Sequence, residues 1–228
     1  NALLTPSEGT LWVNGMDTKD EEHLWDIRQN AGMVFQNPDN QIIGTSVEED
    51  VAFGPENKNI EPEKIRKIVE TVLRKVKLWD RRKASPSILS GGQKQRLATA
   101  DALAGLPACL VLDEPTAMLD PDSRKEVINI VKELNRKEGM TIILITHHTD
   151  EVVDADRIVL MKDGKIIGDD IPKKIFADYE LLKKAKMDIP PVVELGMRLE
   201  KQQIGLEGPV LQEQEMIEKI VKLYRSKC

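Results

Sequence analysis

Cysteine, aromatic residues and long apolar stretches are all scarce in this 228-residue sequence. Its two cysteines, Cys109 inside a short apolar stretch and Cys228 at the last position, exclude a disulfide framework and indicate a reducing compartment. No apolar run approaches the ~20 residues that a membrane-spanning helix needs, and no secretory signal is visible. We therefore expect a soluble, globular, cytoplasmic protein.

The sequence also lacks an excess of positive charge. Its 33 Lys and Arg residues are outnumbered by 39 Asp and Glu residues, which gives a net charge of −6. Non-specific nucleic-acid binding requires a basic face, so this balance argues against a nucleic-acid partner. A chain of this length forms one sizeable domain with an appendage, or two small domains.

Apolar strand patterns alternate with amphipathic helix patterns, which predicts an α/β fold. Residues 108–112 and 141–145 are continuous apolar runs, as in strands that are buried on both faces of a parallel sheet. The helix predicted over 122–138 connects them by a right-handed crossover. The other predicted elements are strands at 10–13 and 32–35, helices at 20–28, from 46, from 62, at 91–105 and at 213–224, and a hairpin at 158–167.

Residues 89–96, with the sequence LSGGQKQR, open one of these helices. Ser90 stands at the N-cap position and Gln93 follows three residues later, which by itself is the spacing of a capping box. Gly91 and Gly92 add a second possibility: without a Cβ, they let an anion approach the free N–H groups at the positive end of the helix dipole. The complete pattern favours anion binding over simple capping.

Two adjacent carboxylates, Asp113 and Glu114, end the apolar run at 108–112. Open α/β sheets bind ligands at the carboxyl ends of their strands. In phosphate-loop nucleotidases an aspartate at this place holds Mg²⁺, and the next carboxylate can act as general base toward water. The alternative is a solvated acidic turn. The four apolar residues that precede Asp113 favour the end of a buried strand over such a turn.

Together, residues 89–96 and 109–115 resemble the signature and Walker B motifs of ATP-binding cassette (ABC) ATPases. This resemblance implies a parallel sheet flanked by helices with an inserted helical signature subdomain. Gln36 resembles the family's Q-loop glutamine, which touches Mg²⁺ and senses the transporter subunit. Asp120 resembles the D-loop acid, and His147 the histidine that contacts the γ-phosphate. His148 stands where the family usually has aspartate, and adjacent strand residues point apart, which argues against a metal-binding histidine pair.

A narrower resemblance is carried by residues 35–41 (FQNPDNQ), 47–57 (VEEDVAFGPEN), 113–121 (DEPTAMLDP) and 145–148 (ITHH). These segments look like those of the ATPase subunit of energy-coupling factor (ECF) transporters, which take up vitamins or cobalt and nickel ions. The resemblance covers the chain from position 1 to about 199.

The family resemblance implies ATP and Mg²⁺ as cofactors and a peripheral location on the cytoplasmic face of the cell membrane. Its partners are a second ATPase, in a homo- or heterodimer, a transmembrane scaffold and a separate substrate-binding membrane protein that selects the substrate. We predict a partial nucleotide-binding domain over 1–168, its helical subdomain over about 37–104, and a C-terminal extension over 169–228 that supports dimerisation. The predicted catalytic residues are Glu114 and His147, the ATP-binding residues are Gln36, Ser90, Gly91, Gly92, Gln93 and Asp120, and the metal ligands are Asp113 and Gln36.

The sequence departs from the family at its front end. No Gly-x-x-x-x-Gly-Lys-Ser/Thr phosphate loop (Walker A) occurs, and the only Gly-Lys pair, Gly164-Lys165, lacks the glycine spacing. We expect a fragment of a longer ATPase, because the downstream motifs are intact. The alternatives are a non-hydrolysing partner that supplies residues 90–93 to a complete subunit, and an ABC ATPase outside transport.

Overall fold

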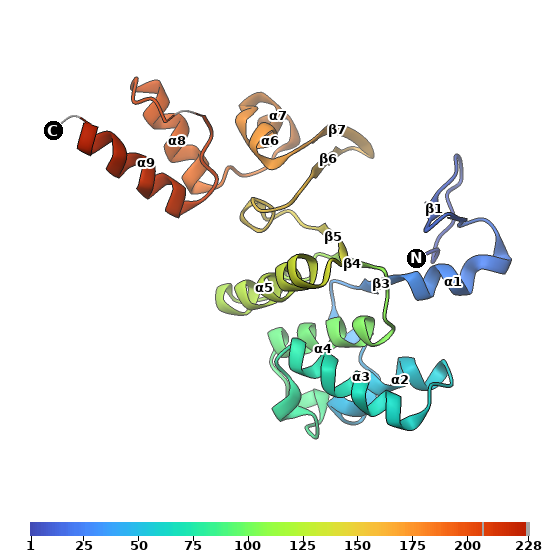
Figure 1. Ribbon diagram of the computed structural model, residues 1–228. Helices are drawn as coiled ribbons and strands as arrows, with labels where there is room; N and C mark the ends of the chain where they lie inside the picture. Colours follow the sequence, from blue (N-terminus) through green and yellow to red (C-terminus); the bar gives the residue numbers. More distant parts are fainter. Residues whose placement is uncertain (207, 227–228) are drawn as a thin grey trace. The chain divides into compact units, whose positions relative to one another are not determined.

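The computed structural model describes residues 1–206 and 208–226. The chain forms two compact units, residues 1–146 and 147–228, and each is described here by itself. The first unit carries a small parallel sheet with its helices, and the second carries an antiparallel hairpin followed by helices (Figure 1). The expected boundary after residue 168 stays a prediction.

The sheet of the first unit has three parallel strands in the order β3 (Ala31–Val34), β4 (Cys109–Asp113) and β5 (Thr141–Ile145). Val34 lies opposite Leu112, and Asp113 lies opposite Ile145. All three strands therefore end at one edge of the sheet, which is where an open α/β sheet binds ligands.

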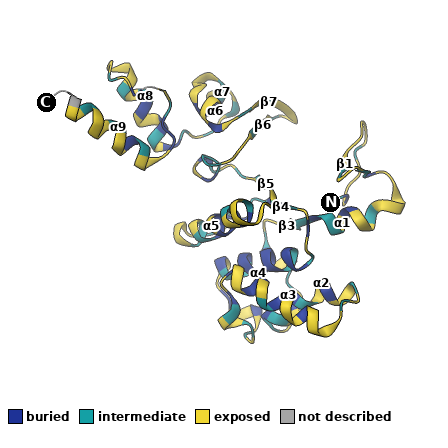
Figure 2. Cartoon of the chain, viewed as in Figure 1, coloured by how far each residue is buried: buried dark blue, intermediate teal, exposed yellow. Residues whose placement is uncertain are grey.

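One face of this sheet is covered by helices. The signature helix α4 (Gly91–Ala104) packs against β3, α5 (Pro121–Glu138) packs against β5, and the two helices contact each other. Both contribute to a single core, and buried stretches of the helices in this unit are dark blue in Figure 2. Its members from the sheet and these two helices are Val34, Leu97, Ala98, Ala100, Leu103, Ala104, Leu110, Leu112, Ile130, Val131 and Leu134.

The inserted helical part is built from α2 (Val47–Asn57), α3 (Pro62–Lys75) and α4, which pack on one another. The helix predicted from 46 starts with a capping box, since Ser46 accepts from the Glu49 N–H and the Glu49 side chain reaches back to the Ser46 N–H. Ahead of the sheet lie the short hairpin β1 (Trp12–Val13) and β2 (Met16–Asp17) and the helix α1 (Leu24–Asn30).

The expectation that β5 is buried on both faces is wrong for the described chain. Ile143 and Ile145 are 50% and 46% exposed, because the described residues leave their side of the strand uncovered. An uncovered apolar strand face is costly in water, and the sequence pattern alone does not reveal which face another element covers.

The second unit contains the hairpin of β6 (Ile158–Lys162) and β7 (Lys165–Asp170), where Arg157 and Asp169 form a bidentate ion pair. The helices α6 (Pro172–Ala177), α7 (Tyr179–Ala185), α8 (Pro191–Lys201) and α9 (Glu213–Ser226) follow. Among the described residues, buried side chains of these helices and of the segment between α8 and α9 form two small cores. In the described parts of the chain, no helix is both long and apolar enough to cross a membrane.

We expect Leu112→Ala to lower the free energy of unfolding by about 2–5 kcal/mol, because Leu112 is fully buried and the truncation leaves a cavity. Ile143→Ala on the neighbouring strand is the matched control, because half of that side chain already lies in water. Urea denaturation followed by circular dichroism measures both variants. Equal losses in the two variants would contradict this assignment of the core.

Candidate functional site

Gln36 and Glu114 meet at the carboxyl edge of the sheet although they are 78 positions apart in the chain. The Gln36 Nε2 donates a hydrogen bond of 3.0 Å to the Glu114 Oε2. The Glu114 N–H donates to the Ile145 carbonyl at the end of β5, at 2.9 Å. Glu114 has a φ of 45°, in the left-handed region that is costly for a non-glycine residue. The backbone of Glu114 is therefore strained, and its carboxylate lies at the carboxyl ends of the strands.

Asp113 is the last residue of β4 and precedes Glu114 directly. A carboxylate beside an amide oxygen is the hard donor set that Mg²⁺ prefers, usually with one or two protein ligands and the rest from phosphates or water. In residues 1–206 and 208–226, no three His, Cys, Asp or Glu side chains gather around one point. The side chains of Asp113 and Gln36 therefore suit a cation whose other ligands come from a bound phosphate or water, and not a cation coordinated by protein side chains alone.

The predicted capping box at the start of α4 is present. The Ser90 Oγ accepts from the Gln93 N–H at 3.4 Å, and the Gln93 Oε1 accepts from the Ser90 N–H at 3.0 Å. This leaves the N–H groups of Gly91 and Gly92 in the first turn for an anion, since the first N–H groups of a helix have no partner within it. The Gln93 side chain is hydrogen-bonded to the Ser90 N–H in this structure. Its contact with ATP stays a prediction.

The two glycines of the signature have different surroundings. A Cβ on Gly92 would lie 2.7 Å from both the Cβ and the Oγ of Ser123, whereas a Cβ on Gly91 would meet only the Leu119 side chain at 3.6 Å. Gly92 is buried and Gly91 is exposed. Gly92 is therefore required for packing α4 against the start of α5, a role that the sequence did not indicate, while Gly91 faces open space.

We expect Gly92→Ala to lower the free energy of unfolding by about 1–3 kcal/mol, because the added methyl overpacks against Ser123. Gly91→Ala is the matched control and should not be destabilising, because its Cβ has room. The double variant Gly92→Ala with Ser123→Gly should recover most of the loss. Denaturation midpoints of the four chains test this, and a double variant as unstable as Gly92→Ala would show that the clash lies elsewhere.

Asp120 caps α5. Its carboxylate accepts from the N–H groups of Ser123 at 3.0 Å and Asp122 at 3.1 Å. Hydrogen bonds from Ser123 are the main reason that the pKa of Asp120 lies below its usual value, so the residue is ionised at neutral pH. The cap sits beside the signature, because Ser123 and Leu119 are the residues nearest to Gly92 and Gly91. Asp120 is thus fixed in place, and its contact with ATP stays a prediction.

His147 opens the second unit, directly after Thr146 and β5. Its side chain is exposed, and its ring lies 4.2 Å from that of His148, tilted by 39°. The role of His147 at the γ-phosphate stays a prediction.

Two glutamines that sequence reasoning missed hold the backbone beside Gln36. Gln41 accepts from the Phe35 N–H at 2.8 Å and donates to the Met33 carbonyl at 3.2 Å. Gln95, which is buried in α4, donates to the Phe35 carbonyl at 3.5 Å. They therefore tie the end of β3 to its following loop and to the signature helix. No pattern in the sequence singles out either residue.

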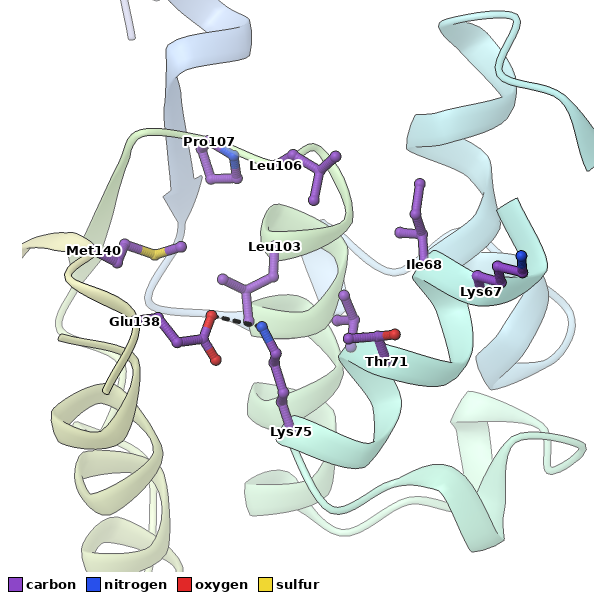
Figure 3. A pocket seen from close by; sticks show the side chains of 10 residues that line it. Lys67, Ile68, Thr71, Lys75, Leu103, Leu106, Pro107, Glu138 and Met140 are labelled. Carbon is purple, nitrogen blue, oxygen red and sulfur yellow. Dashed lines mark hydrogen bonds and ion pairs between the residues drawn. The ribbon is translucent and has the colours of Figure 1, made fainter. Parts of the chain in front are cut away.

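A pocket of about 330 Å³ lies near the other end of the strands, beside Pro107 and Met140, which precede β4 and β5 (Figure 3). It is lined mainly by α3, and an ion pair joins Lys75 to Glu138 at its wall. Ligands of α/β sheets bind at the carboxyl ends of strands, so this pocket is not the counterpart of the Glu114 site.

A parallel sheet with paired carboxylates at its edge and a glycine-rich helix start define an ABC-type ATPase. The family described as ABC transporter matches residues 1–117. The ECF transporter ATP-binding protein EcfA1 of Caldanaerobacter subterraneus subsp. tengcongensis is 56% identical over 222 residues, which are 97% of this chain and 80% of that protein. The chain belongs to the family of ECF transporter ATP-binding proteins.

Solved structures agree with this membership. The structure of cbiO1 from Clostridium perfringens, part of the transporter complex cbiONQ, superposes with a TM-score of 0.74 at 34% identity, covering 87% of this chain and 79% of that one. A dimeric structure of the cassette MJ0796 bound to ADP and Pi gives a TM-score of 0.66 at 30% identity, covering 75% and 76%. The α/β fold, the ATPase class and the transport role predicted from sequence are confirmed, and an ABC ATPase outside transport is set aside.

Proposed function

We propose that the strand-end group of Gln36, Asp113 and Glu114 performs ATP hydrolysis in an ECF transporter, with Glu114 as general base. The observation that carries this is the 3.0 Å hydrogen bond between Gln36 and Glu114, which joins two widely separated predicted motifs at the ligand-binding edge of the sheet. A carboxylate held there by an amide and a fixed backbone is oriented to accept a proton from an attacking water.

The remaining predicted residues take supporting roles. Asp113 and Gln36 would hold Mg²⁺, which when bound neutralises charge on the phosphates. Ser90, Gly91 and Gly92 present N–H groups and a helix dipole to the triphosphate of a second ATPase subunit. Gln93 keeps that helix start capped and, with Asp120 and His147, completes the site around the γ-phosphate.

The proposed assembly contains two ATPases, homo- or heterodimeric, a transmembrane scaffold and a substrate-binding membrane subunit for a vitamin or a transition-metal ion. The similar cassette that is titled as a dimer, and the similar protein titled as part of a transporter complex, support this. The ATPases would sit peripherally on the cytoplasmic face of the membrane. Residues 169–228 would help to hold the ATPase pair together.

The experiment that tests this function is ATP-driven substrate uptake into vesicles that contain the reconstituted transporter. Uptake should require ATP on the side of the ATPases and should stop in the Glu114→Gln variant. A non-hydrolysing partner that only supplies residues 90–93 is the second candidate. It would leave uptake intact when Glu114 of this chain is changed, so the same experiment separates the two functions.

We expect the purified 228-residue chain to show no steady-state ATP hydrolysis. Its sequence contains no Gly-x-x-x-x-Gly-Lys-Ser/Thr, the loop whose N–H groups and lysine supply most of the triphosphate contacts. A coupled phosphate-release assay over a range of chain concentrations measures this. Turnover that grows with chain concentration and disappears in Glu114→Gln would mean that other residues bind the triphosphate.

A further inference from the structure

Asp50 of α2 is buried and faces the segment that follows the Gln36 loop. It is only 4% exposed, and its Oδ1 accepts from the Ile43 N–H at 2.8 Å and the Gly44 N–H at 2.6 Å. The approach is close enough that a Cβ on Gly44 would lie 2.5 Å from the Asp50 nitrogen. Asp50 therefore anchors the end of the loop that begins at Gln36.

Asp101 of α4 lies against the other oxygen of Asp50. The Asp50 Oδ2 and both oxygens of Asp101 are buried, and no N–H or hydroxyl group of the described residues reaches them. The packed helices α2 and α4 bring the carboxyl group of Asp101 next to that of Asp50. Two adjacent buried carboxylates repel each other when both are ionised, and a shared proton removes this repulsion.

Among the described residues, no positively charged group bonds to the Asp50 Oδ2 or to either oxygen of Asp101. The charged side chains that line a pocket of about 430 Å³ beside Asp101 are Arg28 of α1 and Lys58 after α2. Lys58 is directed to the Gly105 carbonyl, to which its Nζ donates at 2.8 Å. The helix α3, which packs on both α2 and α4, adds the apolar side chains of Val69, Val72 and Leu73 to the shared core.

Burial, and then the neighbouring Asp50, raise the pKa of Asp101 well above its ordinary value. Asp101 is therefore the member of the pair that holds the proton, while Asp50 accepts hydrogen bonds from two backbone N–H groups.

We propose that protonated Asp101 donates a hydrogen bond to Asp50 and that this carboxyl pair is a positioning device, which couples the end of the Gln36 loop to the helix that carries the Ser90 signature. Neither residue touches the nucleotide site, so both act through the segments that they hold. The importance of the pair for turnover rests on the proposed roles of Gln36 and Ser90.

The pair has a definite pH dependence. A group whose pKa is raised by folding stabilises the folded chain below its unfolded pKa of about 3.9, and this contribution is lost as the pH rises through the folded pKa. As the pH rises through the raised pKa of Asp101, the proton leaves, two buried carboxylates repel each other, and the segment at Ile43 and Gly44 loosens from α4. The amide of Asp101→Asn donates to Asp50 at every pH and should remove this loss.

The direct test uses the full chain without nucleotide. Infrared spectra of chain with ¹³C-labelled aspartate should show a protonated carboxyl band at neutral pH that disappears in D101N. Hydrogen exchange at the Ile43 and Gly44 amides should stay slow in D101N and speed up on the order of tenfold in D101L, which leaves a buried Asp50 oxygen without a donor. Absence of the band in the wild type, or its persistence in D101N, would overturn the proposal.

The functional test is the pH profile of ATP turnover in the assembled transporter. The wild type should lose kcat on the alkaline side as exchange at Ile43 and Gly44 speeds up, and D101N should shift that loss to higher pH. Identical profiles would overturn the coupling role. If D101L fails to fold, the wild type and D101N still decide the outcome. The spectra and the exchange rates do not involve ATP, so they would stay unchanged if the proposed catalytic role of Glu114 were wrong. They therefore distinguish a failure of that role from a failure of the carboxyl-pair proposal.

Discussion

Replacing Glu114 with glutamine is expected to lower ATP turnover of the assembled transporter by about 100-fold or more, the range that loss of a general base produces. The amide keeps the shape of the side chain and an oxygen that can accept from the Gln36 Nε2, which now donates at 3.0 Å. It cannot accept the proton of an attacking water. ATP binding should therefore persist, and equilibrium binding with a labelled nucleotide should separate the two effects.

The matched control is Glu133→Gln, which removes one negative charge from an exposed glutamate and breaks its surface pair with Lys137. It should leave turnover near the wild-type rate. If Glu114→Gln also kept that rate, the base would lie elsewhere, and His147 would be the next residue to change.

Gly91→Asp is expected to abolish ATP turnover when both ATPase subunits carry it. The new carboxylate would stand at a helix start proposed to face the γ-phosphate, and the repulsion between like charges opposes closure of the site. The fold should tolerate the change, since a Cβ on Gly91 meets only Leu119 at 3.6 Å. Gly91→Ala controls for added volume and should retain more activity than Gly91→Asp. Phosphate release by the reconstituted complex measures both variants.

A mixed pair of subunits tests whether the signature acts across the subunit boundary. Both subunits are otherwise complete ATPases that include a phosphate loop; one carries Gly91→Asp and the other carries an inactivated phosphate loop. If the signature acts in trans, both lesions fall on one nucleotide site, the second site is intact, and partial activity remains. The mirror pair, with both lesions on one subunit, then has one lesion at each site and should be inactive. The opposite pattern in the two pairs would show that Gly91 acts in cis.

Much of the site could be predicted because its residues lie in short, dense patterns. The order of Ser90, Gly91 and Gln93 predicted the start of the helix and its capping box, because both depend only on local backbone geometry. The apolar run before Asp113 gave a strand ending in carboxylates, because a strand buried in a sheet must be apolar. Such local rules also placed α3, α5 and the hairpin of β6 and β7.

Contacts between distant segments could not be predicted in this way. Gln41 and Gln95 hold the backbone beside Gln36, and no spacing marks them. The need for glycine at position 92 comes from Ser123, which lies 31 positions away on another helix. The exposure of Ile143 depends on what covers β5, and an apolar strand pattern carries no information about that.

The sequence by itself determined the class of protein, the order of its motifs and the chemistry that each motif can perform, because these depend on residue types at fixed short spacings. Only the tertiary structure decided that Gln36 bonds to Glu114 and that Asp50 meets Asp101. The physical reason is that packing of helices and strands brings side chains from separate segments within hydrogen-bonding distance, where burial and neighbouring charge change what a carboxyl group does. An isolated aspartate in a helix has an ordinary pKa, and Asp101 departs from it because α2 and α4 pack together.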